Sequence, residues 1–406
     1  MVHLPSQLDQ AWCRISARPP AVDMAEIWQP STAPSLVVAA PTVSLDDLQD
    51  RIENGIKDII KEIARPLRLD ETPGAHTISL DDFKMMDSNG TFPHMGHATP
   101  KPAPDAISQV SQAKVAHKPA FQSKFASASA AQQCAQNPNM RFEWRDYSDS
   151  DRHALVDGIK CLMNKPPSGK FQPSTNRYED LVRIHQDYAP NIHNNNKFLI
   201  WHRYFLWTFE QMLREECGFN RAFVFWDETK DAGHFAESSM FSPSSLAACP
   251  VPLTVPAFAN TTLHIGPGTG NSPHCLSRAV DETATAQCSK DFENYCLSKT
   301  TYPEFESCWE YGPHGYGHNG IGSVMGDVLG SVGDPAFWMH HSYIDRVFRV
   351  WQNVDESRRT TISGTIAGGA PLTLDTPVVM GGLRPDVQVR DVLDTLNGVM
   401  CYRYNY

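Results

Sequence analysis

The sequence predicts a mainly helical domain, on three observations. Long stretches repeat apolar residues at intervals of three and four, which places these residues on one face of a helix. Two of the stretches, 197–216 and 334–348, also carry a histidine within the apolar face. Their ends suit helix termini, because Asp334-Pro335 favours a helix start and Cys217-Gly218 a helix stop.

The composition restricts the partners of the chain. Its 406 residues correspond to one large domain or two smaller ones. The formal net charge of −11 argues against nucleic acids and anionic membranes as partners. No apolar run approaches the ~18 residues that a membrane span needs. We therefore expect neither a nucleic-acid nor a membrane partner.

The cysteines and the N-terminus give conflicting indications of location. Nine of the ten cysteines follow residue 133. Six of these are expected in loops, where secreted proteins often form disulfides: Cys249, Cys275, Cys288, Cys296, Cys308 and Cys401. The first residues lack the basic start and apolar core of a signal peptide. Secretion, with a misassigned start of the gene, is one hypothesis that accommodates both facts.

Residues 1–132 are predicted to form an extension of the main domain. Proline, serine and alanine are frequent there and aromatic residues are few, so we expect it to be largely disordered. One amphipathic helix is predicted at Leu45–Ile63. His94, His97 and His117 lack helical spacing and apolar neighbours, so we do not assign them as metal ligands.

The domain from residue 133 to residue 406 begins with two predicted helices. A capping pattern at Ser148 opens the first helix. The second runs from about Thr175 to Tyr188 and is expected to end at Ala189-Pro190, since proline interrupts helices. His185 lies on its apolar face.

A third helix, from Lys197 to Glu216, follows a polar loop that contains His193. His202 lies in its apolar face, beside Phe198 and Phe205. Burying an imidazole without a partner is costly, so such a histidine needs a hydrogen bond or a metal. One histidine of this kind is more often a hydrogen-bonded core residue, so the interpretation depends on whether others join it.

Further histidines lie toward the C-terminus. His314 and His318 are four residues apart, as a metal-binding pair on a helix requires, although the neighbouring glycines weaken that helix. His341 lies on the apolar face of the helix that begins at Asp334. His340 competes with it, because periodicity barely separates the two. A strand-rich tail is expected to follow.

Six histidines therefore form two sets of three: His185, His193 and His202, and then His314, His318 and His341. No cysteine or carboxylate falls within either set. All-imidazole sites suit copper and zinc, whereas di-iron sites in helical bundles use glutamates. Three histidines per metal leave a position for a small ligand. The alternative is that these are six core histidines, each with its own hydrogen bond and no metal, which the helical spacing disfavours.

Several motifs resemble those of tyrosinases and catechol oxidases, the type 3 copper enzymes. The two copper signatures are similar to Phe198-Leu199-Ile200-Trp201-His202-Arg203 and to Asp334-Pro335-Ala336-Phe337-Trp338-Met339-His340-His341 with Asp345-Arg346. The resemblance runs from about Cys134 to the end of the chain. It includes Phe142-Glu143-Trp144-Arg145, Pro273-His274-Cys275-Leu276-Ser277-Arg278 and a closing Cys401-Tyr402-Arg403-Tyr404 that looks like the short fungal branch.

This resemblance implies a four-helix bundle around a dinuclear copper site, with small strands and long disulfide-linked loops. It assigns one histidine set to each of the two copper ions and leaves His340 behind the ligands. Asp345 or backbone carbonyls are expected to orient the rings. The implied reaction is oxidation of catechols to o-quinones with reduction of O2 to water. Phenolic small molecules and O2 are the implied partners, and o-hydroxylation of monophenols is a further activity of the family.

The sequence departs from the family's pattern at several positions. Asn191 replaces a cysteine that forms a thioether in many fungal tyrosinases, so we expect no thioether. Gly315 replaces the asparagine or aspartate often found in enzymes that hydroxylate monophenols, which favours a catechol oxidase. Glu306 is expected to hold a water molecule, with Glu310 as the alternative. Val328 matches a position that guards the entrance.

Other functions share parts of this pattern. Full monophenolase activity, as in a tyrosinase, is the nearest alternative. A haemocyanin-like oxygen carrier shares the six histidines but shields them with another domain, which the sequence does not show. A zinc hydrolase needs a catalytic carboxylate, and a copper-less relative would lack ligands. The glycine-rich segment usual between the two copper halves is not evident at residues 238–259.

Overall fold

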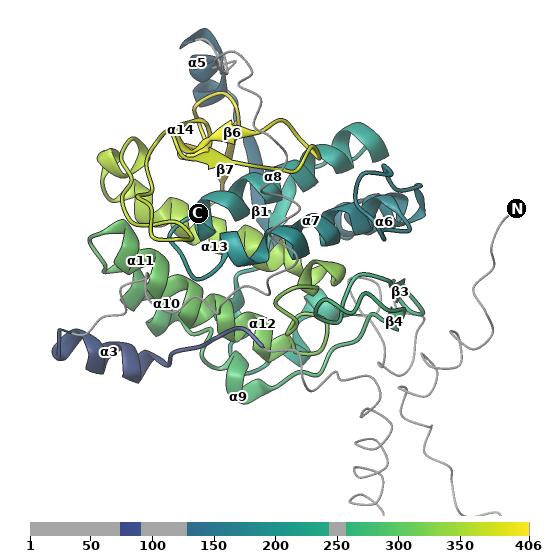
Figure 1. Ribbon diagram of the computed structural model, residues 1–406, viewed down its shortest axis with the longest axis horizontal. Coiled ribbons are helices and arrows are strands. Elements are labelled where there is room, and N and C mark those ends of the chain that lie inside the picture. The colour runs from purple at the N-terminus through teal and green to yellow at the C-terminus, as the bar shows by residue number, and fades with distance from the viewer. Residues whose placement is uncertain (1–73, 91–127, 243–256, 406) are drawn as a thin grey trace, which may run out of the picture.

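The computed structural model describes residues 74–90, 128–242 and 257–405 (Figure 1). The predicted helix at Leu45–Ile63 lies outside these residues, as does most of the segment 238–259. The expected domain boundary at residue 132 falls within a helix, α5 (Ala128–Gln136).

The described residues form a mainly helical fold, which confirms the predicted class. Besides α5, the helices are α3 (Leu80–Ser88), α6 (Asp149–Asn164), α7 (Arg177–Ile192), α8 (Phe198–Cys217), α9 (Glu282–Thr285), α10 (Lys290–Leu297), α11 (Tyr302–Trp309), α12 (Gly315–Ile321), α13 (Ala336–Asn353) and α14 (Val389–Val392). None of these described helices has the length and apolar character of a membrane span.

The centre of the fold is built on α8. This helix packs against α6, α7 and α13, and Figure 1 shows α8 and α13 in the middle of the molecule, with α10, α11 and α12 to one side. Gly218 stops α8 in the left-handed conformation, at φ 67°, as expected for a glycine after a helix. Ser148 caps α6 by accepting a hydrogen bond from the Asp151 backbone N–H.

Small strands tie the ends of the domain together. β1 (Asn139–Glu143) lies between β2 (Phe223–Phe225) and β7 (Tyr402–Tyr404), and both pairings are parallel. Two antiparallel pairs complete the described strands: β3 (Thr262–Leu263) with β4 (His274–Cys275), and β5 (Pro377–Val378) with β6 (Val387–Gln388). The prediction of a strand-rich tail after α13 is wrong, because the short strands β5, β6 and β7 are separated there by loops and α14.

A buried ionic network joins β1 and β7 to the central helices. The Asp345 carboxylate on α13 accepts hydrogen bonds from Arg203 on α8, at 2.5 Å, and from the hydroxyls of Tyr402 and Tyr404 on β7. The Arg141 guanidinium on β1 lies 3.4 Å from the same carboxylate and 3.5 Å from the centre of the Tyr402 ring. The charges compensate one another, and neighbouring arginines lower the pKa of Asp345 despite its burial.

The end of α7 differs from the prediction. Pro190 does not stop this helix, which continues to Ile192. Proline removes one backbone donor, but the next turn is still held by the His193 N–H, which donates to the Ala189 carbonyl at 3.2 Å. Full burial of Ile192 stabilises the same turn. The extra turn carries the chain directly to His193.

The disulfides also differ in part from the prediction. Cys296 and Cys308 lie in helices, α10 and α11, rather than in loops, and they bond to each other. Both helices have only eight residues, too few for a clear apolar period. Two further disulfides are Cys134–Cys401 and Cys161–Cys217, and Cys275 is also disulfide-bonded. Cys288, expected in a loop with possible pairing, has a buried free thiol.

Candidate metal centre

Local structure around the central helices brings the six predicted histidines together. His185 lies on α7 and His193 follows its last turn, and His202 lies on α8. The other three are His314 at the end of a kinked segment (Glu310–His314), His318 on α12 and His341 on α13. The kink is at Gly312, where a Cβ would lie 2.6 Å from the Phe292 ring, so only glycine fits there.

The histidines form two adjacent clusters. In the first, formed by His185, His193 and His202, the ligand nitrogens lie within 4.8 Å of one another. The second contains His314, His318 and His341 together with His340, at the same limit. The rings of His202 and His341 stack with centroids 4.6 Å apart, so the two clusters meet where α8 packs on α13.

Backbone carbonyls orient most of the rings. The Nδ1 atoms of four histidines lie 2.8–3.1 Å from a carbonyl oxygen, which fixes the proton on Nδ1 and turns the Nε2 lone pair inward: His193, His202, His314 and His318. Asp345, the other expected orienting group, does not do this. Its carboxylate lies in the arginine–tyrosine network, because Arg203 and Arg141 attract it away from the rings.

The resulting arrangement fits metal ions. The Nε2 atoms of His202 and His185 are 3.4 Å apart, and those of His318 and His341 are 3.2 Å apart. The buried Nε2 of His314 has no hydrogen-bond partner in the described part of the chain. Burial lowers the pKa of these rings, that of His193 to about 4, so they are neutral at pH 7. Converging neutral imidazoles without a carboxylate suit copper or zinc.

His340 is distinguished from His341 by its partner. Its Nδ1 lies 2.5 Å from the Glu228 carboxylate, and both side chains are fully buried. His341 instead directs Nε2 toward His318. The geometry therefore leaves His340 as a second candidate metal ligand in the same cluster, although its Nδ1 already binds the Glu228 carboxylate.

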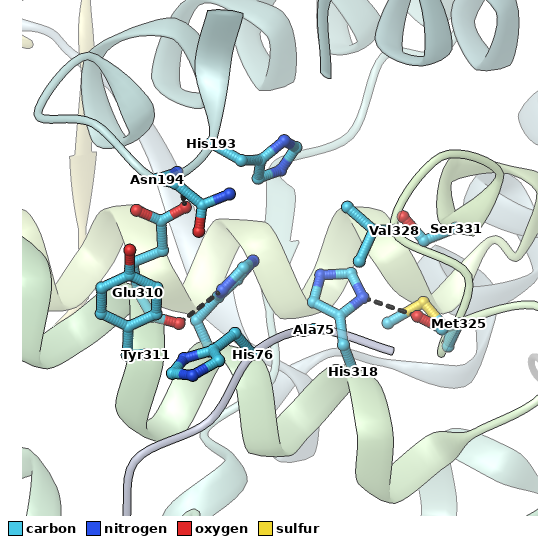
Figure 2. Close-up of a pocket in the computed structure, with 11 residues that line it drawn as sticks. Ala75, His76, His193, Asn194, Glu310, Tyr311, His318, Met325, Val328 and Ser331 are labelled. Carbon is cyan, nitrogen blue, oxygen red and sulfur yellow. Dashed lines mark hydrogen bonds between the residues drawn. The ribbon is translucent and has the colours of Figure 1, made fainter. Parts of the chain in front are cut away.

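A cavity of about 50 Å³ lies against both clusters (Figure 2). His193, Asn194 and Glu310 form one side, and Val328 lies across from them beside His318. Val328, the residue expected at the entrance, therefore does line the cavity.

Of the two glutamates considered, Glu310 lines the cavity and Glu306 lies behind it. Glu310 accepts a hydrogen bond from the Asn194 N–H at 2.8 Å, whereas Glu306 is fully buried and accepts from Asn196. Burial raises the pKa of Glu306, and raises that of Glu310 to about 8. Glu306 and Glu310 thus form a buried carboxyl pair beside the histidines.

The sequence did not indicate two parts of the site. Ala75 and His76 line the cavity although they belong to the predicted extension, and residues 76 and 77 cover Gly315, which the sequence had indicated for a different reason. Asn194 was seen only as part of a polar loop. The cluster of polar residues from Asn191 to Asn196 was the signal available for it, while nothing local to residues 74–78 indicates a role.

Comparisons with known proteins agree with this geometry. A family model described as the common central domain of tyrosinase matches residues 175–354, which include all six predicted histidines. Tyrosinase P of Aspergillus terreus is 28% identical over 328 residues, 66% of this chain and 92% of that protein. Tyrosinase ustQ of Aspergillus flavus is 30% identical over 292 residues, 66% of this chain and 80% of that protein. A solved polyphenol oxidase variant from Thermothelomyces thermophila matches with a TM-score of 0.61 and 26% identity, covering 68% of this chain and 96% of that one.

Proposed function

Because the chain belongs to the tyrosinase family, we propose that this oxidoreductase converts catechols to o-quinones at a dinuclear copper centre. The observation that carries the proposal is the pair of neutral three-histidine clusters that meet at the His202–His341 stack. Two copper ions, when bound, supply the electron transfer, and two catechols reduce one O2 to two waters. His185, His193 and His202 would hold one ion, and His314, His318 and His341 the other.

The protein's own groups orient the metal ligands and exclude water. The carbonyls that bind Nδ1 fix the direction of each Nε2, and the rings of Phe198 and Phe337 pack against the histidines. The cavity is the route by which a phenol would reach the clusters. Val328 at its side would limit the size of the aromatic ring that enters.

The carboxyl pair is placed to handle protons. Glu310 borders the cavity with its Oε1 held by the Asn194 N–H, and Glu306 supports it from behind. We propose that this pair holds a water molecule that accepts the hydroxyl proton of the incoming phenol, whereas the sequence suggested Glu306 for the water, with Glu310 as the alternative. Glu310 is then the member nearer the substrate.

The preference between catechols and monophenols is proposed from Gly315. The chain has no side chain at the position where a hydrogen-bonding residue is expected in monophenol hydroxylases. We therefore propose catechol oxidation as the main activity. The disulfides further support an oxidising compartment, and hence secretion, for the natural protein.

The test is oxygen consumption by the copper-loaded chain, with catechol and with the matched monophenol in parallel. Uptake with catechol and a much slower or absent uptake with the monophenol is the expected result. Equal uptake with both would make the protein a tyrosinase. A His202→Ala variant serves as the control, because it removes one ligand and should abolish the activity together with one copper ion.

A further inference from the structure

Residues 74–90, here called the strap, lie against the candidate metal centre. Figure 2 shows Ala75 and His76 at the border of the cavity, among the residues that line it. Ala75 exchanges two hydrogen bonds with the Asn319 side chain, at 2.9 and 2.7 Å, and Asn319 follows His318 directly in the chain. The Ile78 N–H donates to the Tyr311 carbonyl at 2.9 Å. The strap is thus bound to two of the three segments that carry histidines of the second cluster, the segment that ends at His314 and α12.

The strap is fixed at its other end by α3. Phe83 is its one buried residue, and its ring packs on Phe292 and Tyr295. Asp87 bonds to Lys299 and to the Tyr295 hydroxyl. These contacts lie on α10 and the loop after it, away from the histidines. The strap is therefore held at this end by a small anchor that is separate from the metal centre.

Gly315 is shaped to the strap. A Cβ at this position would lie 2.9 Å from the Thr77 methyl group and 3.1 Å from the His76 carbonyl oxygen. Both distances are shorter than ordinary contacts, so any side chain would push the strap outward. The strap can therefore dock in this position only because residue 315 has no side chain.

The covered cavity is too small for the proposed substrate. Its volume is about 50 Å³, whereas a protein cavity that binds benzene measures about 150 Å³. Water and O2 fit such a space, but a catechol ring does not.

We propose that the strap is an intramolecular inhibitory cover, which must leave its docked position before phenolic substrates reach the metal centre. The proposal rests on the proposed function, since it concerns the access of phenols. The rate of phenol oxidation is then proportional to the fraction of molecules in which the strap is undocked. Loss of the α3 anchor, by sequence change or by cleavage near the strap, would activate the protein.

The test uses the full chain with Phe83→Ala, which removes the anchor without touching the cavity. Met85→Ala is the matched control, because Met85 lies on the same helix with 55% of its surface exposed. Hydrogen exchange of residues 74–90 reports whether the strap is docked. Access to the centre is read from copper removal by the small ligand cyanide and by the bulky chelator bathocuproine disulfonate, alongside catechol oxidation.

For Phe83→Ala we expect faster exchange in the strap, about tenfold or more faster copper removal by the bulky chelator, and a comparable gain in kcat/KM for catechol. Cyanide should show a smaller gain, and Met85→Ala should match the unchanged protein. Faster exchange with unchanged chelator access would overturn the proposal, as would lower catechol oxidation, which would make the strap part of the substrate site. If no form oxidises catechol but chelator access rises, the proposed function fails and the cover stands.

Discussion

Replacing Asp345 by alanine tests how the fold holds the two central helices together. The carboxylate is the shared acceptor for Arg203 on α8, for two tyrosine hydroxyls on β7 and, at 3.4 Å, for Arg141 on β1. Its side chain is only 3% exposed, and those of both arginines are fully buried. Removing one member of a buried ion pair leaves an uncompensated charge, which costs about 3–5 kcal/mol. We expect Asp345→Ala to lower the free energy of unfolding by this amount.

The assay is guanidinium unfolding of the copper-free full chain, followed by tryptophan fluorescence. Glu215→Ala is the matched control, since Glu215 lies on α8 and pairs with Arg384 at 2.7 Å, but 56% of its side chain is exposed. Such a surface pair contributes about 0–1 kcal/mol. Equal effects of the two variants, both below about 1 kcal/mol, would refute the reasoning, because they would show that burial does not amplify the Asp345 interactions.

Two further predictions concern the histidines. His341→Ala should lose one copper ion per chain, whereas His340→Ala should keep two with about 10–100-fold weaker binding, as measured by metal analysis after dialysis; loss of copper from both variants alike would assign His340 as a ligand. In the copper-free protein, the free energy of unfolding should rise from about pH 4.5 to about pH 6.5. The reason is that burial lowers the pKa of seven histidines, so the unfolded chain binds more protons than the folded chain in that range. These histidines are His185, His193, His202, His314, His318, His340 and His341. Above this range stability should decline toward pH 8, since the buried Glu228, Glu306 and Glu310 have raised pKa values and stay protonated only in the folded state; unfolding midpoints across pH 4.5–8 check both slopes, and a flat profile contradicts them.

The helix histidines were predictable because their signal is local. His202 and His341 lie within apolar stripes of long helices, and the 3.6-residue period alone places them on buried faces. His314 and His318 needed only their spacing of four residues. That the two clusters meet at a ring stack was not predictable from periodicity, because it depends on how α8 packs on α13.

The errors have a common physical origin in contacts between distant segments. The turn after Pro190 persists because Ile192 is buried, which no residue near Pro190 indicates. Glu306 and Glu310 were not separated by the sequence, since both precede His314 at helical spacing. The backbone is not helical at Gly312, where φ is −93° and ψ is −118°, so the helical spacing between Glu310 and His314 does not describe their geometry. In the fold, Glu310 lines the cavity and Glu306 does not.

The absence of a side chain at Gly315 has two explanations, and one substitution at this position cannot separate them. As a residue beside the first histidine of the second cluster, its missing side chain favours catechol oxidation over monophenol hydroxylation. As a neighbour of Thr77 and His76, it is the position at which any side chain would displace the strap. A Gly315→Asn variant changes both at once, so a gain in monophenol oxidation by this variant alone would not identify the cause. The same substitution in the Phe83→Ala background, where we expect the strap to be undocked, leaves only the chemical effect of the asparagine.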